Sequence, residues 1–341
     1  MASQTLLRSK LPLVAAPMAG GPTSLALVET VSEAGAFPFL AGGYKTPEAL
    51  GEQVEAARGL GVDFGVNLFV PEGCPVDREA FNAYAAELQP EAEAYGVTLN
   101  LEPVIDEDHW QQKLDLLTER PVPVVSLTFG LPGQEEVARL QGVGTTVLIS
   151  VTTVEEARAA QVVGANGLVV QGPRAGGHSA THDPTRIPEI ADTAAVVKLV
   201  AQAVPLPVIG AGGIDGPESV CRILDAGAEA AALGTLLLRT DEAGTSATHR
   251  AALGDPLFSE TMLTCAFTGR PARALRNGFI DRHQATAPVA YPAVHHLTKT
   301  LRQAAGKAGD ADRLHLWAGT GYRNAPTGSA ASVIDWLAES L

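Results

Sequence analysis

The sequence predicts an α/β fold, a closed (β/α)8 barrel, and three observations support this prediction. Short apolar runs alternate with helical patterns throughout residues 12–239. The runs are continuously apolar, as in parallel strands that are buried on both faces. Eight such runs, nearly all separated by helical patterns, fit a barrel with helices on its outside. A doubly wound open sheet is the alternative that the same alternation permits.

The expected strands share a short run of mostly apolar residues. They cover residues 12–18, 37–43, 64–70, 122–130, 145–151, 167–172, 206–213 and 231–239. The segments between them carry apolar residues at helical spacing. These helices cover residues 24–35, 47–61, 134–144, 154–166, 191–204 and 217–228. In the first helix Ser24 offers an N-cap and Gly35 a stop, and Pro47 suits the first turn of the second.

Two segments do not follow the alternation. Residues 71–120 hold helical patterns at 81–95 and 110–119, with an irregular or short extended piece, "VTLNLEPV", between them. Residues 240–341 hold loops, Pro-flanked segments and a terminal helical pattern, "SAASVIDWLAESL". We therefore expect a barrel over residues 1–240 with an inserted helical segment. Residues 241–341 are expected to form a lid or accessory segment packed on it within one structural domain.

Composition limits the classes of function. The net charge of −14 disfavours nucleic acid and anionic membranes as partners. No stretch reaches the roughly 18 apolar residues of a membrane span, and the N-terminal apolar run is a poor signal peptide. Cys74, Cys221 and Cys265 lie far apart without a CxxC pair or a zinc-binding spacing. This pattern predicts reduced thiols, a cytoplasmic location and no metal.

Polar residues lie near the ends of the expected strands, where barrel enzymes place their active sites. Asn67 follows apolar residues in the third strand, and Gln171 ends the sixth. A buried amide must find hydrogen-bond partners. Each amide therefore either makes a structural hydrogen bond inside the barrel or donates to and accepts from the edge of a heteroaromatic ring.

Glycines at the last two strands indicate a phosphate site. "GAGGI" places Gly212 and Gly213 at the end of the seventh strand, and "LGT" places Gly234 and Thr235 in the eighth. Barrels often hold phosphate in the loops after these strands, because glycine lets backbone N–H groups approach the oxygens closely. Taken singly, each pair is more often just a turn. Together they favour a phosphate-bearing ligand.

The stretch "GLVVQGPRAGGHSATHDP" carries the candidate catalytic residue. His178 follows a buried strand and two glycines, at the expected catalytic end of the barrel. Its unperturbed pKa near neutrality suits proton transfer, although a loop histidine that caps backbone is the alternative. His182 and Asp183 could orient it or lie on the surface. His295 and His296 in the tail are interpreted as a solvated or packing pair.

Taken in order, the motifs resemble the nitronate monooxygenase family, formerly called 2-nitropropane dioxygenases. They are "APMAGG", "FLAGGYKTPE", "FGVNLF", "VSLTFG", "VQGPRAGGH", "PVIGAGGI" and "LGTLLLR", followed by "TGRPARALRN" and "LWAGTGYR" in the tail. The resemblance implies a (β/α)8 barrel that binds FMN noncovalently. It also implies oxidation of alkyl nitronates, such as propionate 3-nitronate, by O2 to a carbonyl compound and nitrite.

The resemblance assigns roles to residues. Ala16, Pro17 and Met18 would pack against the flavin, and Asn67 and Gln171 would bond its ring system and ribityl side. Gly176 and Gly177 would line the ring, and Gly212, Gly213, Gly234 and Thr235 would hold the phosphate. His178 would be the active-site histidine. It would take a proton from a nitroalkane when neutral, or stabilise a nitronate when protonated. Tyr44, Tyr291 and Lys299 are candidates for binding substrate.

Departures from the family pattern leave alternatives open. Ser179 stands where the family usually has Arg, and Arg174 where it often has Glu. The flavin enoyl-acyl-carrier-protein reductases carry a similar Gly-Gly-His on the same barrel. The alternatives are therefore an NAD(P)H-dependent flavin reductase of quinones or enoyl thioesters, and a noncatalytic protein that binds FMN or another phosphate ligand.

Overall fold

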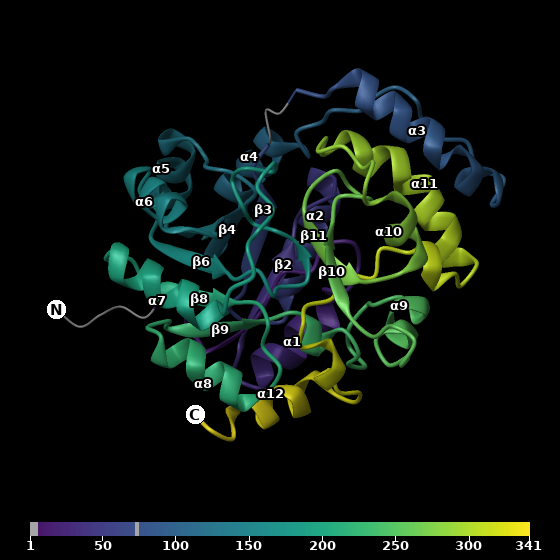
Figure 1. The fold of residues 1–341 in the computed structure, drawn as a ribbon. Helices are drawn as coiled ribbons and strands as arrows, with labels where there is room; N and C mark the ends of the chain where they lie inside the picture. The colour runs from purple at the N-terminus through teal and green to yellow at the C-terminus, as the bar shows by residue number, and fades with distance from the viewer. Residues whose placement is uncertain (1–5, 72–74) are drawn as a thin grey trace.

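The computed structural model describes residues 6–71 and 75–341, and its centre is a closed parallel barrel (Figure 1). The barrel strands, in order around the closed sheet, are β1 Leu13–Ala15, β2 Phe37–Ala41, β3 Gly65–Phe69, β4 Val124–Thr128, β5 Thr146–Val151, β6 Gly167–Gln171, β8 Val208–Ala211 and β9 Ala230–Leu233. β1 closes the barrel by pairing in parallel with β9, Val14 opposite Ala232. The predicted (β/α)8 barrel is confirmed, and the open sheet is excluded.

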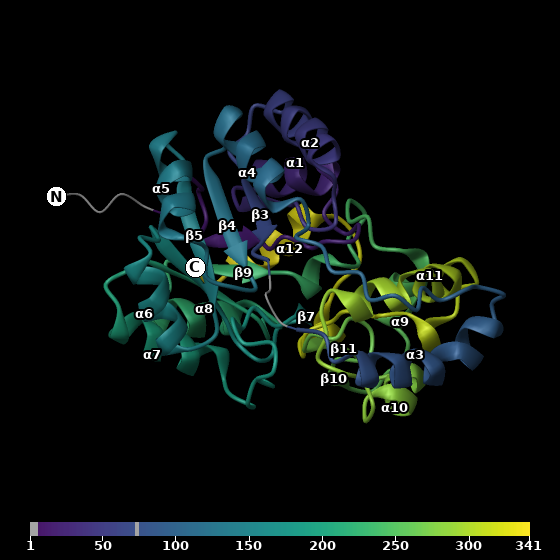
Figure 2. The same cartoon turned by 90° about the horizontal axis from the view of Figure 1, so that it is seen from above.

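Helices surround the barrel, as Figure 2 shows from above. They are α1 Leu25–Glu33, α2 Pro47–Gly59, α4 Trp110–Glu119, α5 Gln134–Gly142, α6 Val154–Val162, α7 Thr193–Ala203, α8 Pro217–Asp225 and α12 Ala330–Ala338. The Ser24 hydroxyl accepts a hydrogen bond from the Leu27 N–H, which confirms the predicted N-cap. Val333 and Ile334 of α12 belong to the barrel's hydrophobic core, so the end of the chain supplies the helix that follows the last strand.

The last barrel strand is shorter than the sequence predicted. β9 ends at Leu233, and residues Thr235–Leu237 form a short 3-10 helix, η1, capped by Gly234. The expectation that Gly234 and Thr235 lie within the strand was therefore wrong. The chain turns at Gly234, where the Leu237 N–H donates to the Gly234 carbonyl at 2.9 Å, and the Thr235 hydroxyl accepts a hydrogen bond from the Gly319 N–H at 2.9 Å.

An accessory layer lies beside the barrel (Figure 2). It comprises α3 Arg78–Glu93, α9 Ala247–Ala252, α10 Gly278–His283, α11 Ala293–Lys307 and a sheet of β10 Thr261–Thr264, β11 Ala272–Leu275 and β7 Gly177–His178. Phe81 and Leu88 of α3 share one hydrophobic cluster with Phe279 and Leu301 of the tail. Helix α3 of the inserted segment and this part of the tail therefore pack as one layer, whereas α4 and α12 pack on the barrel. The division at residue 240 stays a prediction.

The structure bears on the cysteines, on membrane-spanning helices and on metal-binding clusters. Cys221 and Cys265 are free thiols, and Cys74 lies outside the described residues. Within residues 6–71 and 75–341, no helix is long and apolar enough to cross a membrane. The same residues contain no group of three or more His, Cys, Asp or Glu side chains that could hold a metal ion. The cytoplasmic location stays a prediction.

Candidate active site

One large cavity opens at the carboxyl ends of the barrel strands, against the accessory layer. Its volume is about 1310 Å³, above the usual range of ligand pockets and large enough for a cofactor together with a substrate. Every residue that the sequence marked as a candidate for the site lines it, namely Ala16, Pro17, Met18, Tyr44, Asn67, Gln171, Gly176, Gly177, His178, Gly212, Gly213, Gly234, Thr235, Tyr291 and Lys299. The fold therefore assembles the predicted set in one place.

Glycines from three loops form one wall of this cavity. Gly212 and Gly213 have φ of +105° and +73°, a backbone conformation that side chains with a Cβ rarely adopt. A Cβ on Gly176 would lie 2.4 Å from the Gly319 nitrogen, so the two backbones touch without side chains between them. This cradle suits a phosphate that is bound by backbone N–H groups. Sequence reasoning assigned no role to Gly319, although it lies in the tail motif "LWAGTGYR".

Hydroxyl groups of the neighbouring barrel strand hold the amide of Asn67. Its Nδ2 donates to the Ser126 hydroxyl at 2.9 Å and to the Thr128 hydroxyl at 2.8 Å. Thr128 in turn shares a hydrogen bond with the Ser150 hydroxyl at 2.9 Å. No hydrogen bond within the described part of the chain reaches Asn67 Oδ1. That oxygen is therefore available to accept from a ring N–H of a ligand, while the other end of the amide is structural.

Gln171 holds the chain that carries the histidine. Its Nε2 donates to the His178 carbonyl at 3.1 Å, and its Oε1 accepts from the Ala180 N–H at 2.8 Å. The side chain thus folds the segment after β6 back over the barrel. Gly177 and His178 then pair with Arg273 and Ala272 of β11, a short strand that the sequence did not predict.

His178 lies between the barrel and the accessory layer as a neutral base. Its Nε2 is 3.0 Å from the Thr268 hydroxyl, and that hydroxyl donates to the Arg270 carbonyl at 3.3 Å. Nε2 therefore carries the proton, and Nδ1 keeps its lone pair. Burial, reinforced by the positive charge of Arg302, lowers the pKa of His178 to about 3. Of the two predicted roles, the structure favours proton abstraction by neutral histidine.

Aromatic rings enclose this histidine. The centroids of Phe129, Tyr291 and Trp317 lie 5.5, 5.9 and 5.3 Å from that of His178. Phe129 follows β4 with φ of +87°, a strained conformation for a bulky residue that brings its ring over the site. Sequence reasoning missed Phe129, Trp317 and Thr268, even though "VSLTFG", "LWAGTGYR" and "TGRPARALRN" contain them.

The candidate substrate residues meet on the accessory side. Tyr44 stacks on His295, with ring centroids 4.4 Å apart and planes within 5°. The hydroxyls of Tyr44 and Tyr291 lie 3.4 Å apart, and burial raises the pKa of Tyr44 to about 12. Lys299 is exposed at the rim. His295 is buried and packs on Tyr44, but His295 and His296 both line the cavity, so their interpretation as a pair remote from the site was wrong.

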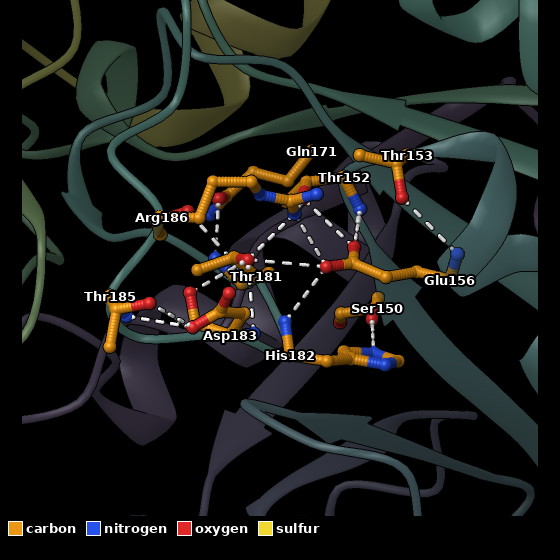
Figure 3. Close-up of polar contacts among 12 residues, drawn as sticks. Ser150, Thr152, Thr153, Glu156, Gln171, Thr181, His182, Asp183, Thr185 and Arg186 are labelled. Carbon is orange, nitrogen blue, oxygen red and sulfur yellow. Dashed lines mark hydrogen bonds and ion pairs between the residues drawn. The ribbon is translucent and has the colours of Figure 1, made fainter.

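A polar network anchors the loop after His178 (Figure 3). The buried carboxylate of Glu156, on α6, accepts from the His182 N–H at 2.9 Å and the Thr152 N–H at 2.6 Å. It also accepts from the Thr181 hydroxyl at 3.1 Å and pairs with Arg186 at 2.5 Å. The His182 ring bonds the Ser150 carbonyl through Nε2 at 2.9 Å. His182 therefore has a structural role, and it does not orient His178.

Comparisons with known proteins agree with this architecture. Residues 4–340 match the family model described as nitronate monooxygenase. A probable nitronate monooxygenase of Staphylococcus saprophyticus is 33% identical over 342 residues, covering 97% of this chain and 94% of the relative. One from Staphylococcus aureus strain Newman is 30% identical over 334 residues, covering 96% and 94%.

Among solved structures, the nitroalkane oxidase of Streptomyces ansochromogenes superposes with a TM-score of 0.92 at 44% identity, covering 98% of this chain and 96% of that one. FabK from Thermotoga maritima superposes with a TM-score of 0.77 over 98% and 94% of the two chains, and at 23% identity it shows a shared fold alone.

The residues present fit a flavin. The glycine cradle could accept a phosphate, the open oxygen of Asn67 could accept from a ring N–H, and the cavity has room for both a flat ring and a substrate. The family match spans nearly the whole chain. From the site and the comparisons together, the chain belongs to the nitronate monooxygenase family and is a flavin-dependent oxidoreductase.

Proposed function

We propose that the protein oxidises alkyl nitronates, such as propionate 3-nitronate, with FMN and O2 to a carbonyl compound and nitrite. The observation that supports this most is the neutral, enclosed His178 in the cavity where the predicted cofactor residues converge. A base with a lone pair on Nδ1 suits removal of the α-proton of a neutral nitroalkane, which forms in the site the nitronate that is then oxidised. The family membership supports the same class of substrate.

The cofactor half of the site is assigned to the barrel. Gly212, Gly213, Gly234 and Thr235 would hold the FMN phosphate at the cradle, with Gly176 and Gly177 lining the ring. Ala16, Pro17 and Met18 would pack against the isoalloxazine, and Asn67 and Gln171 would bond its polar edge. When bound, FMN would take electrons from the nitronate and pass them to O2.

The substrate half is assigned to the side of the cavity that His178 and the accessory layer form. His178 Nδ1 would take the α-proton of a neutral nitroalkane, and its Nε2–H, donated to Thr268, fixes the orientation of the ring. Tyr44, Tyr291 and Lys299 would contact the substrate. The aromatic rings around His178 exclude water from the base, which keeps its pKa low.

One experiment distinguishes this function from the NAD(P)H-dependent alternative. Purified protein should be yellow and should release FMN on denaturation. In an anaerobic cuvette, propionate 3-nitronate should bleach the flavin rapidly and NAD(P)H should not. In air, the nitronate should yield nitrite without NAD(P)H. Rapid bleaching by NAD(P)H together with inertness to the nitronate would replace the proposal with a reductase.

A further inference from the structure

Arg302 is a buried cation in the wall of the cavity. It belongs to α11, is 6% exposed and lines the cavity beside His295. Its Nε donates to the Thr298 hydroxyl at 2.9 Å, and its Nη2 donates to the His295 carbonyl at 3.0 Å. These bonds fix the plane of the guanidinium. Nη2 also lies 3.3 Å from His295 Nδ1. Nη1 makes no hydrogen bond within residues 6–71 and 75–341, so its two N–H groups are left for a ligand.

No carboxylate among the described residues pairs with this guanidinium. Lys113, a buried cation elsewhere in the fold, has such a partner, because Asp108 Oδ2 lies 2.7 Å from its Nζ. Asp106, which also lines the cavity, is paired with His296 at 2.7 Å. A charge buried without a counter-ion is costly, so its retention beside an open cavity indicates that an anion completes the site.

The groups around Arg302 are neutral rings. Its Nη2 lies 3.3 Å from His295 Nδ1, and its positive charge adds to burial in lowering the pKa of His178, His295 and His315. Tyr44 and Tyr291 face it with un-ionised hydroxyls, since burial raises the pKa of both. An anion that enters this part of the cavity therefore meets one cation and no competing carboxylate from these neighbours.

We infer that Arg302 is the specificity-determining residue that binds the two oxygen atoms of the substrate's nitro or nitronate group. The two N–H groups of Nη1 can donate charge-assisted hydrogen bonds to these oxygens, and the guanidinium cannot lose its charge at neutral pH. The inference rests on the proposed function. It deepens that function by assigning the substrate's charge to one side chain on the accessory layer rather than to the exposed Lys299.

This assignment also supports the proton transfer. When His178 Nδ1 takes the α-proton of a nitroalkane, the C–H electron pair forms the C=N bond and the negative charge moves to the nitro oxygens. The proton remains on the imidazole, which becomes a cation. Arg302 then faces the nitro oxygens, where the new negative charge collects. Its positive charge stabilises that negative charge and lowers the barrier to the proton transfer.

The test uses the flavin-loaded enzyme and nitrate, an inert planar oxyanion, followed through the change it causes in the visible spectrum of the bound flavin. Arg302→Met should weaken nitrate binding by about tenfold or more, whereas Arg302→Lys should keep part of it. Lys307→Met, which removes one exposed charge from the same helix, should bind nitrate within about twofold of wild type. Flavin content and thermal unfolding confirm that each variant is folded.

Nitrate binding retained in Arg302→Met but lost in Lys299→Met would overturn the inference. If the Arg302 variants do not fold, a wild-type crystal soaked in nitrate provides the test. We expect the ion at the Arg302 guanidinium, and an ion bound only elsewhere would contradict the inference. The readout needs no turnover. If nitrate binding depends on Arg302 but the enzyme is inert to nitronates, the inference stands and the proposed function is wrong. If the enzyme oxidises nitronates but nitrate binding does not depend on Arg302, the proposed function stands and the inference is wrong.

Discussion

The Nε2 of His178 lies 3.0 Å from the hydroxyl of Thr268, although ninety positions separate the two residues in the chain. His178 stands in the segment after β6, opposite Ala272 in the small accessory sheet, and Thr268 lies just before β11. The segment after barrel strand β6 therefore supplies the histidine, and the tail supplies the group that sets which of its nitrogens carries the proton. The accessory layer is part of the candidate active site.

Replacing Thr268 by Val should slow turnover without emptying the cofactor site. Without the hydroxyl, Nε2–H loses its acceptor and the ring loses its fixed tautomer, so we expect kcat to fall by about tenfold to 100-fold. KM should change little, and Thr268→Ser should restore most of the rate. A fall in flavin content that accounts for the whole loss would assign Thr268 a merely structural role.

The pH dependence of turnover tests whether His178 is neutral. Its lowered pKa of about 3 keeps it unprotonated throughout the neutral and mildly acidic range. Oxidation of neutral nitroethane should therefore show no fall in kcat/KM between about pH 8 and pH 5 that depends on His178. A histidine with an ordinary pKa would lose roughly thirtyfold at pH 5. An inflection near pH 6.5 that disappears in His178→Gln would contradict the neutral base.

The same shift has a consequence for stability. Because the folded-state pKa lies below the ordinary value, the unfolded chain binds the proton more readily. The contribution of neutral His178 to stability is therefore complete above about pH 6.5 and is lost as the pH falls toward about 3.

The glycine cradle should not tolerate a methyl group. Gly176→Ala would place a Cβ 2.4 Å from the Gly319 nitrogen, so the two loops must move apart. We expect FMN binding to weaken by about tenfold or more, equivalent to roughly 1.4 kcal/mol. Gly142→Ala is the matched control, since a Cβ at this helical position has no neighbour within 4 Å. Equilibrium dialysis against FMN measures both, and equal affinities would remove Gly176 from the cofactor site.

Barrel elements are predictable because each depends on local pattern. The helix over residues 110–119 was expected from periodicity alone, and the structure places α4 at the same residues. The length of the last strand, predicted as 231–239, was overestimated because its end does not follow from local pattern. "AAALGTLLLR", residues 230–239, is mostly apolar, and nothing in it shows that Thr235 is held by Gly319, which lies eighty-four positions later.

The accessory half of the site depends on contacts between distant segments. Arg302 lies in an amphipathic helix and belongs to no motif. Only the folded structure shows that it is buried beside the cavity without a carboxylate partner among its neighbours. Gln171 shows the converse. Its place at the end of β6 was predictable, but its amide folds the His178 segment back through Ala180, which a strand-end position alone does not reveal.

Glu156 should stabilise the loop that follows His178. Glu156→Ala leaves the N–H groups of His182 and Thr152 without their acceptor, and we expect a loss of about 1–3 kcal/mol in the free energy of unfolding. Burial raises the pKa of Glu156, but hydrogen bonds from these two backbone groups outweigh it and lower the pKa overall. The stabilisation should therefore be complete above the ordinary value of 4.5 and decline as the pH falls below it.

Chemical denaturation of both proteins from pH 7 down to about pH 3 measures this difference, which should narrow on the acid side. Glu155→Ala is the control, because Glu155 is exposed in the same first turn of α6 and shares its helix-terminal position. If both variants lose the same stability, the effect belongs to the helix terminus and the network of Figure 3 contributes nothing. A larger loss in Glu156→Ala, accompanied by slower turnover with flavin still bound, would show that this carboxylate holds His178 in position through the loop.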